Sequence, residues 1–536
     1  MITFGVLLTV MTLCGCKVKT TVVNDSNPPM PRRLIFVSDM DHPSLNLKFD
    51  RRLLTLSDVH AFVDDYADTQ VSTFMVSAGE DIPTYRSKYN RLVGDDDGGR
   101  LNCGKNTALY ELFRTENRNI LNLEKDGIDI VEAQLKRAKE KGMETFLTFR
   151  MNDIHFTNPA FGYTLVWSDF WVQHPEYWIN ENPGWNTFGA YDYAHSEVRQ
   201  YRLNLIFEQL ELYGHLIDGY DLDFQRSPMF FKSGTGAQNS PLMTDFVKTL
   251  KSKIDEISAI HGKKIMLSAR VPIDIDFGYS EGLDVKEWIK LGLLDFLTIS
   301  NYVETDPSMP VAKSIQDLGV PQIPIYVAVD YGSNFQPHSV GMKRGIASHI
   351  YAQGGNGIYL FNYFFDTPST ERGLVHRKVS RELLMELGSM ETLKKRNKMI
   401  ALNTAAAAFH YWYTGKAPLP LTVSSDVQTV NLFVGGCLQE DVPEQIILFI
   451  RTNREVEAGV QINGVNVVPL DMEYVSLYDA DNKLNEGEKV YAFSVPVSAV
   501  QQGDNEIGIR SQGSEFRVLR LEMAIRYGDV ATHGYF

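Results

Sequence analysis

One short segment of the chain concentrates residues that could do acid–base chemistry. Residues 218–226 read DGYDLDFQR. Because alternate side chains of a β-strand share a face, Asp221, Asp223 and Gln225 are expected to point the same way, into the protein. Two carboxylates held close together away from water push the pKa of one of them up, which is the condition for a general acid at neutral pH. The structural alternative is a carboxylate network bonded to Arg226 or to backbone amides.

A second group of candidates comes at the end of an earlier strand-like segment, residues 144–151. It comprises polar side chains suited to bind hydroxyl groups, with one carboxylate among them: Arg150, Asn152, Asp153 and His155. The next stretch is rich in aromatic residues and includes Trp167 and Trp171, two of the six tryptophans. Flat rings in a long loop suit the apolar faces of sugars. The alternative is a small satellite core that pins this loop.

The pattern around these residues predicts a (β/α)8 barrel as their scaffold. Short apolar segments alternate with stretches whose apolar residues recur at helical spacing, which is typical of a parallel sheet covered by helices. A closed barrel is favoured over an open, doubly wound sheet because no Gly-rich phosphate loop follows the first strand. The predicted strands are residues 34–38, 72–77, 144–151, 219–225, 264–271, 296–302, 325–330 and 357–363. Predicted helices between them include residues 128–141, 197–213, 242–261, 285–291 and 340–353.

Carboxylates at the strand ends of such a barrel are expected to meet, because the loops after the strands form one concave face. Glu304 and Asp330 follow the sixth and seventh predicted strands, and Tyr302 ends the sixth. Asp39 and Asp41, after the first strand, are further candidates. The alternative for each of these carboxylates is an ordinary solvated loop residue or a helix cap.

The pattern changes near residue 402. We assign residues 32–402 to the barrel domain, with residues 372–402 as its closing and exit helices, and residues 403–420 to a linker that contains GKAPLP. Residues 421–536 show short alternating segments with turn sequences such as Asn463-Gly464, which predict an all-β, jelly-roll-like sandwich. Its turns resemble those of carbohydrate-binding or accessory modules attached to glycosidases. A purely structural role for this domain stays open.

The sequence LDFQRSP at residues 222–228 resembles a signature of the "family 10-like" group of bacterial glycosyl hydrolases. Further pieces are similar to that group: RMND with His155 at residues 150–155, HPE at 174–176, AHSEVR at 194–199 and GLDVKEW at 282–288. The resemblance covers most of residues 33–400. It implies a TIM barrel that hydrolyses glycosidic bonds, but it does not specify the sugar.

The same strand also resembles the chitinase-like family 18 motif, Asp-Gly-x-Asp-x-Asp-x-Glu. Asp218, Gly219, Asp221 and Asp223 match this motif, while Gln225 stands where that family has its acid. An amide cannot donate a titratable proton, so the acid would have to come from elsewhere in the chain.

We therefore expect a glycoside hydrolase that acts on an oligo- or polysaccharide. Asp223 and Asp221 would be central, Arg226 would orient them, and Glu304 or Asp330 would be the second carboxylate that glycoside hydrolysis requires. The rival hypothesis is a non-catalytic carbohydrate-binding surface protein that has lost its acid. No cofactor or metal is expected, because no Cys/His cluster has the spacing of a zinc site.

Charge and the N-terminal residues indicate where such a protein would work. A net charge of −15 over 536 residues disfavours nucleic acid as a partner. Residues 1–16 resemble a bacterial lipoprotein signal, with an apolar run too short to span a bilayer and then LCGC, in which Cys16 would be lipidated. The alternative is an unremarkable apolar N-terminus. We expect residues 17–31 to be a tether, and the protein to be a monomer held in the bacterial cell envelope, in the periplasm or at the outer membrane, by its lipid alone.

Overall fold

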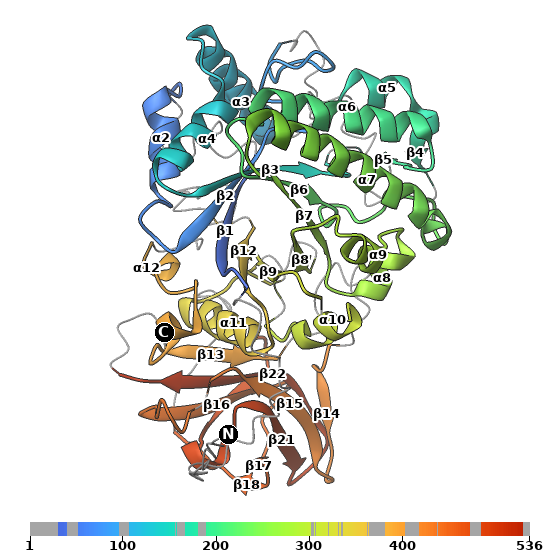
Figure 1. Ribbon diagram of the computed structural model, residues 1–536. Helices are drawn as coiled ribbons and strands as arrows, with labels where there is room; N and C mark the ends of the chain where they lie inside the picture. Colours follow the sequence, from blue (N-terminus) through green and yellow to red (C-terminus); the bar gives the residue numbers. More distant parts are fainter. Residues whose placement is uncertain are drawn as a thin grey trace, which may run out of the picture.

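A closed barrel of eight parallel strands forms the larger part of the fold (Figure 1). The computed structural model describes residues 30–39, 52–95, 107–155, 157, 167–180, 189–301, 305, 307–319, 321–330, 332–333, 336–361, 363, 381–402, 417–436, 438–471 and 484–528. The barrel strands are β1 (Arg33–Ser38), β2 (Val71–Ser77), β3 (Glu144–Arg150), β6 (Gly219–Asp223), β7 (Met266–Pro272), β8 (Phe296–Ser300), β9 (Ile325–Val329) and β12 (Gly357–Leu360). Each pairs with its neighbour in sequence order, and β12 closes the ring on β1. The predicted barrel is confirmed.

Helices surround the barrel, as the alternating pattern predicted (Figure 1). The longer ones are α2 (Leu56–Asp64), α3 (Thr107–Lys125), α4 (Ile130–Glu140), α6 (Ser196–Tyr213), α7 (Gly236–His261) and α11 (Val340–Ala352). Shorter ones are α5 (Asp169–Gln173), α8 (Ile275–Ser280), α9 (Val285–Lys290) and α10 (Val311–Asp317). Two short ribbons, β4 (Trp178–Ile179) with β5 (Ala190–Tyr191) and β10 (Gly332–Ser333) with β11 (Gln336–Pro337), lie in the loops. None of the helices in the described ranges is long and apolar enough to cross a membrane.

The inside of the barrel is layered by polarity. At the amino ends of the strands, Arg33 makes an ion pair with Glu144 and donates a hydrogen bond to Tyr326. Above this lies an apolar layer inside the barrel that includes Ile35, Met75, Phe146 and Phe296. It is separate from the larger apolar cluster between the barrel strands and the surrounding helices, which we call the barrel–helix core. These side chains plug the barrel, so a ligand can approach only from the carboxyl ends of the strands.

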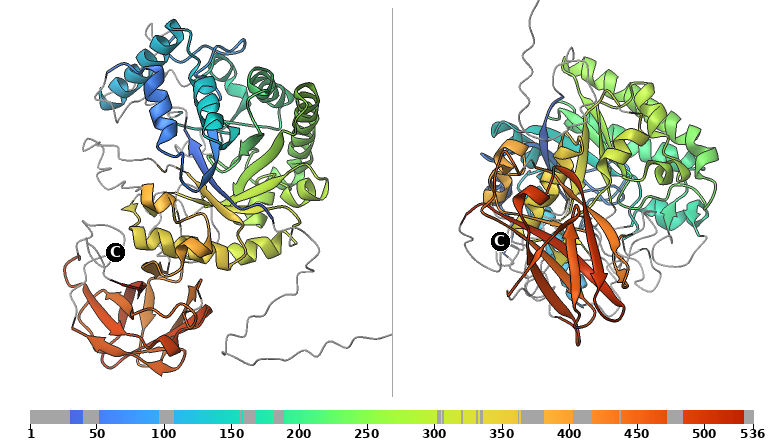
Figure 2. Two further views of the ribbon diagram at one scale, coloured as in Figure 1. Left: turned by 60° about the vertical axis from the view of Figure 1, so that its left-hand side comes forward. Right: turned by 90° about the horizontal axis from the view of Figure 1, so that it is seen from below.

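The C-terminal domain is a sandwich of two antiparallel sheets (Figure 2). One sheet has the order β13 (Lys398–Ala401), β22 (Phe516–Arg526), β16 (Gln445–Thr452), β20 (Lys489–Ser494) and β19 (Val468–Leu470), with β14 (Leu421–Val423) also paired to β22. The other has the order β15 (Gln428–Val434), β21 (Gly503–Ser511), β17 (Ala458–Ile462) and β18 (Val465–Asn466). The predicted sandwich is confirmed.

The end of the barrel domain differs from the expectation. Instead of closing and exit helices, the described part of residues 372–402 holds two short helices, α12 (Arg381–Leu384) and α13 (Met390–Leu393), and then strand β13, which joins the sandwich. Ile400 packs into the sandwich core, whereas Met399 and Ala401 pack into the barrel–helix core. A segment that is apolar on both faces has no strand-like alternation, which is why its sequence did not reveal a strand.

Candidate functional site

The two aspartates of β6 lie on the inner face of the barrel, as the alternation predicted. Asp221 is fully buried and accepts hydrogen bonds from Ser268 Oγ at 2.6 Å and Thr148 Oγ1 at 3.0 Å, on the two neighbouring strands. Burial raises the pKa of Asp221 to about 6, the charge of Asp223 adds to this effect, and the two hydroxyl groups oppose it. Asp221 is therefore a largely neutral carboxyl group in mildly acidic solution, enclosed by hydroxyls.

Asp223 is held by an arginine that the sequence analysis did not single out. Arg270 Nε and Nη2 donate to its two carboxylate oxygens at 2.9 and 2.8 Å, and both side chains are buried. The register of β6 and β7 places these two residues directly opposite each other. The fork of two N–H donors on the guanidinium matches the two oxygens of a carboxylate. Arg226, which we expected to orient the aspartates, contacts neither of them and instead meets the ring of His155.

Arg150, at the end of β3, connects several carboxylates at the mouth of the barrel. Its guanidinium donates to Asp39 Oδ2 at 2.5 Å and to Asp153 Oδ2 at 2.9 Å, and its backbone N–H donates to Glu80 Oε1 at 3.0 Å. In the β3–β6 register it lies opposite Asp223. The ends of β1, β2, β3 and β6 thus converge here, as parallel strands of a barrel must.

Asp153 is the ionised member of this group. Burial works against its charge, yet the His155 ring, Arg150 and Arg226 together hold the pKa of Asp153 well below its usual range. His155 Nδ1 lies 2.6 Å from Asp153 Oδ1, and the His155 backbone N–H donates to the same oxygen at 3.0 Å. A stable negative charge is therefore fixed at the mouth of the barrel.

Glu80 belongs to the group although the sequence analysis did not name it. It stands three residues after β2 and is buried. Burial raises the pKa of Glu80 to about 7, and the nearby charge of Arg150 only partly offsets this. The rule that strand ends converge would have found it, since Ser77-Ala78-Gly79-Glu80 directly continues the second predicted strand.

Two amide side chains near the site have opposite environments. Asn152 donates to the carbonyl oxygens of Tyr191 and Met229 and accepts the Tyr191 N–H, so its whole amide group holds backbone in place. Gln225 is 0% exposed, and neither its Nε2 nor its Oε1 has a hydrogen-bond partner among the described residues. Leaving both halves of a buried amide unpaired costs on the order of 1–3 kcal/mol for each unpaired group. Gln225 is therefore a buried amide that a ligand or a water molecule would satisfy.

The tryptophans expected to line a cleft are packed. Trp167 and Trp171 are buried, their rings lie 4.3 Å apart, and Trp171 stacks on Trp178 at 4.0 Å. Trp167 Nε1 donates to the carbonyl oxygen of His155, which ties this aromatic stack to the loop that carries Asp153. Trp167, Trp171 and Trp178 thus match the alternative of a small satellite core that pins this loop.

The remaining predicted residues are only partly visible. Asp330 directly follows β9 and is buried, and its backbone N–H donates to Thr305 Oγ1 at 2.6 Å. It faces Lys343 of α11, where burial lowers the pKa of the lysine to about 8 while Asp330 opposes the shift. Tyr302, Glu304 and Cys16 lie outside the described residues, and so does Asp41.

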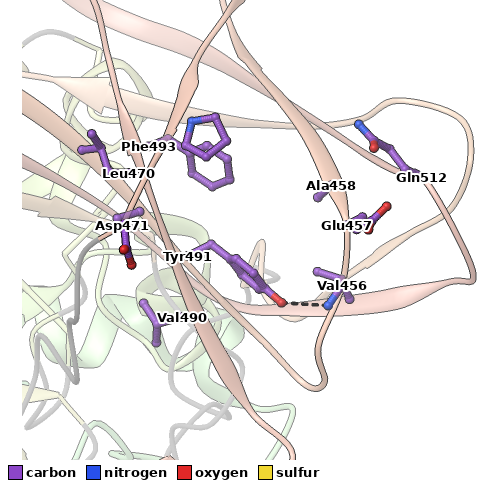
Figure 3. A pocket seen from close by; sticks show the side chains of 11 residues that line it. Val456, Glu457, Ala458, Leu470, Asp471, Val490, Tyr491, Phe493 and Gln512 are labelled. Carbon is purple, nitrogen blue, oxygen red and sulfur yellow. Dashed lines mark hydrogen bonds between the residues drawn. The ribbon is translucent and has the colours of Figure 1, made fainter.

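Within the described ranges, no group of three or more His, Cys, Asp or Glu residues could hold a metal ion. A cavity of about 470 Å³ opens in the C-terminal sandwich, between β17 and the β19–β20 pair (Figure 3). The Tyr491 ring lies across it with the hydroxyl accepting the Val456 N–H, and Glu457 and Asp471 stand on different walls. This cavity contains none of the residues predicted from the sequence to be functional.

Comparisons with known proteins connect the chain to other barrels only loosely. No family model matches the sequence, and no curated protein is significantly similar to it. The resemblance to the "family 10-like" group is therefore not confirmed at the level of a family. Among solved structures, an α-L-fucosidase from Paenibacillus thiaminolyticus aligns over 90% of this chain and 97% of its own, with 11% identity and a TM-score of 0.35.

A cycloisomaltooligosaccharide glucanotransferase from Paenibacillus sp. aligns over 92% of this chain with 11% identity and a TM-score of 0.33, and the chain spans 57% of its length. A tryptophan synthase from M. tuberculosis aligns over 67% of this chain and 92% of its own, with 10% identity and a TM-score of 0.31. Carbohydrate-active barrels are thus among the similar structures, but scores of this size carry no conclusion about activity.

Proposed function

We propose that the protein is a glycoside hydrolase whose site lies at the carboxyl ends of β1, β2, β3 and β6. One observation carries the proposal. Two buried carboxyl groups of opposite tendency meet at Arg150: Asp153 accepts from its guanidinium at 2.9 Å and has its pKa held well below the usual range, while Glu80 accepts from its backbone N–H at 3.0 Å and has its pKa raised by burial to about 7. Glycoside hydrolysis needs such a division, with one carboxylic acid to protonate the leaving oxygen and one carboxylate to act on the opposite side.

The other polar groups have supporting roles in this proposal. Asp223 and Arg270 form a buried ion pair that fixes the floor of the site, and the free amide of Gln225 bonds a sugar hydroxyl. Asp330 remains a candidate for a further carboxylate, and so, from the sequence, does Glu304. The substrate is an oligo- or polysaccharide, in line with the resemblance of residues 222–228 to glycosyl hydrolases.

Turnover of oligosaccharides tests this function. Purified protein is incubated with a panel of neutral oligosaccharides, and new reducing ends are measured for the wild type, for Asp153→Asn and for Asp245→Asn. Asp245 is an exposed helix carboxylate that serves as the matched control. We expect Asp153→Asn to lose at least ~10³ of the rate while Asp245→Asn keeps it. Equal rates in all three proteins would refute the proposal.

A second candidate function follows from Gln225, which stands where the family 18 motif has its acid. A barrel that binds carbohydrate without hydrolysing it would keep the unpaired Gln225 amide and need no proton donor. Calorimetric binding of the same oligosaccharides, without any release of reducing ends, would favour this reading.

A further inference from the structure

We propose that Glu80 is the proton donor of the site, supplying the acid that Gln225 cannot. The inference rests on the proposed glycosidase function and assigns a catalytic role within it.

The other described carboxylates of the mouth are committed to partners. Both oxygens of Asp223 accept N–H groups of Arg270, Asp153 is shared between Arg150 and His155, and Asp39 is paired with Arg150. Asp221 lies deeper, and each of its oxygens accepts a hydroxyl group from an adjacent strand. None of these four carboxylates is placed to offer a proton to a substrate at the mouth.

Glu80 differs from them in how it is held. Its Oε1 accepts hydrogen bonds from the Arg150 backbone N–H at 3.0 Å and from Ser77 Oγ at 3.3 Å. Its Oε2 accepts none from the described part of the chain, so this oxygen is the one that can bear a proton. One oxygen is thus positioned by the barrel, and the other has no hydrogen-bond donor against it in the described ranges.

Among the residues that the structure describes, no cation forms an ion pair with Glu80, and the nearby charges of Arg150 and Arg202 offset only part of the effect of burial on its pKa. The guanidinium of Arg150 is engaged by Asp39 and Asp153. Arg202 of α6 donates to the carbonyl oxygen of Arg150 at 2.6 Å and lies 3.4 Å from Asp81. Other ionisable groups facing Glu80 are two buried tyrosines, Tyr193 and Tyr220, whose pKa values burial raises. A buried carboxyl group without an ion pair prefers its neutral form, in line with its pKa of about 7.

Proton transfer from Glu80 would cleave the glycosidic bond. The O–H bond of Glu80 breaks, its proton bonds the glycosidic oxygen, and the bond from that oxygen to the anomeric carbon breaks with its electron pair staying on the oxygen. The leaving group departs as an alcohol, and the charge that develops on the sugar is balanced by ionised Asp153. Water then adds at the anomeric carbon, and its displaced proton restores the Glu80 carboxyl group.

Leaving-group dependence separates a proton donor from a structural residue. Wild type, Glu80→Gln and the control Glu208→Gln are compared on a disaccharide and on the matching 4-nitrophenyl glycoside, whose phenolate leaves without protonation. Glu208 is an equally buried glutamate, bonded by Tyr85, Ser87 and the Lys88 N–H outside the site. We expect Glu80→Gln to lose about 10²–10⁴ in kcat on the disaccharide and less than about tenfold on the nitrophenyl glycoside, with Glu208→Gln near wild type on both. Equal losses on the two substrates, or none, would overturn the assignment.

The pH profile and infrared spectroscopy provide independent readouts. Because only the protonated donor works, wild-type kcat on the disaccharide should fall above about pH 7, and Glu80→Gln should lack this alkaline limb. The wild type minus Glu80→Gln infrared difference spectrum should show a carboxyl band that disappears around the same pH. A carboxylate ionised from pH 5 upward would overturn the assignment while leaving the glycosidase proposal standing. A carboxyl group that titrates near pH 7 in a protein that hydrolyses no glycoside would refute the proposed function, and the donor role with it.

Discussion

Asp221 and Asp223 stand two residues apart on one strand, yet different groups compensate their burial. Asp223 has a buried arginine opposite it, and Asp221 has only hydroxyl groups. From the sequence we expected the two carboxylates to repel each other, but the ion pair with Arg270 changes what substitution should do.

We predict that Asp223→Asn destabilises the protein by about 3–5 kcal/mol, because it leaves the buried charge of Arg270 uncompensated. Urea unfolding at pH 7 measures this. The double variant Asp223→Leu with Arg270→Met removes both charges and should recover much of the loss. A single variant as stable as the wild type would show that the ion pair does not matter for folding.

Asp221→Asn should instead increase the free energy of unfolding, by an amount that depends on pH. The folded-state pKa of Asp221, about 6, lies above its ordinary value of 3.8, so the folded protein binds the extra proton between these two values. Wild-type stability from this group is fully present below pH 3.8 and is lost as the pH rises through 6. The amide can bond both hydroxyls without charge, so above pH 6 the variant should be more stable by up to about 3 kcal/mol. Unfolding at pH 5 and pH 8 tests this, and a variant that is less stable at pH 8 would contradict it.

Strand alternation alone predicted that Asp221, Asp223 and Gln225 share the inner face. It could not predict Arg270 or Glu80 as neighbours. The partner of Asp223 is decided by the register of β7 against β6, which depends on how the whole barrel closes. We expected Arg226 to orient the aspartates because it is close to them in sequence. In the structure its side chain lies against the ring of His155 instead.

At the level of elements, the eight barrel strands were predicted to within a few residues because their apolar runs alternate regularly with helices. Strand β13 was missed because it is buried on both faces, by α11 and by the sandwich core. Such a strand shows no periodicity that distinguishes it from a buried helix.

Helix α11 meets β13 through a glycine, which gives a test of this contact. A Cβ added at Gly345 would lie 1.9 Å from the carbonyl oxygen of Met399, so Gly345→Ala should push the helix off the strand and cost at least about 1–3 kcal/mol. Gly278 of α8 is the matched control, since its nearest neighbour would be 3.8 Å away. Gly278→Ala should gain up to about 1 kcal/mol in thermal unfolding. Two variants of equal stability would contradict the α11–β13 packing.

On the scale of the whole molecule, barrel and sandwich share packing. Ile447, Phe449 and Ala524 of the six-stranded sheet belong to the same apolar cluster as the barrel–helix core. A sandwich cut at residue 421 would lose β13 and leave residues 522–525 of β22 without this neighbouring strand. We therefore expect a fragment of residues 397–528 to give a cooperative β-type thermal transition, and a fragment of residues 421–528 to be less stable. Equal melting temperatures would contradict this domain boundary.

We propose that the chain is anchored in the cell envelope through Cys16, from the lipoprotein-like pattern of residues 1–16. Cells that express the full chain are labelled with a radioactive fatty acid, and the protein is recovered and counted. Incorporation should be lost in Cys16→Ala and kept in Cys14→Ala. Equal incorporation in wild type and Cys16→Ala would end the lipid-anchor proposal.

A crystal structure of Glu80→Gln bound to an oligosaccharide that the wild type cleaves would test the proposed catalytic site most directly. We expect a sugar at the carboxyl ends of β2, β3 and β6, with the side-chain amide at position 80 in hydrogen-bond reach of a glycosidic oxygen. Asp153 should lie beside the same sugar, and the Gln225 amide should bond one of its hydroxyls. A sugar bound only in the sandwich cavity, or one at the barrel mouth that contacts neither position 80 nor Asp153, would contradict it.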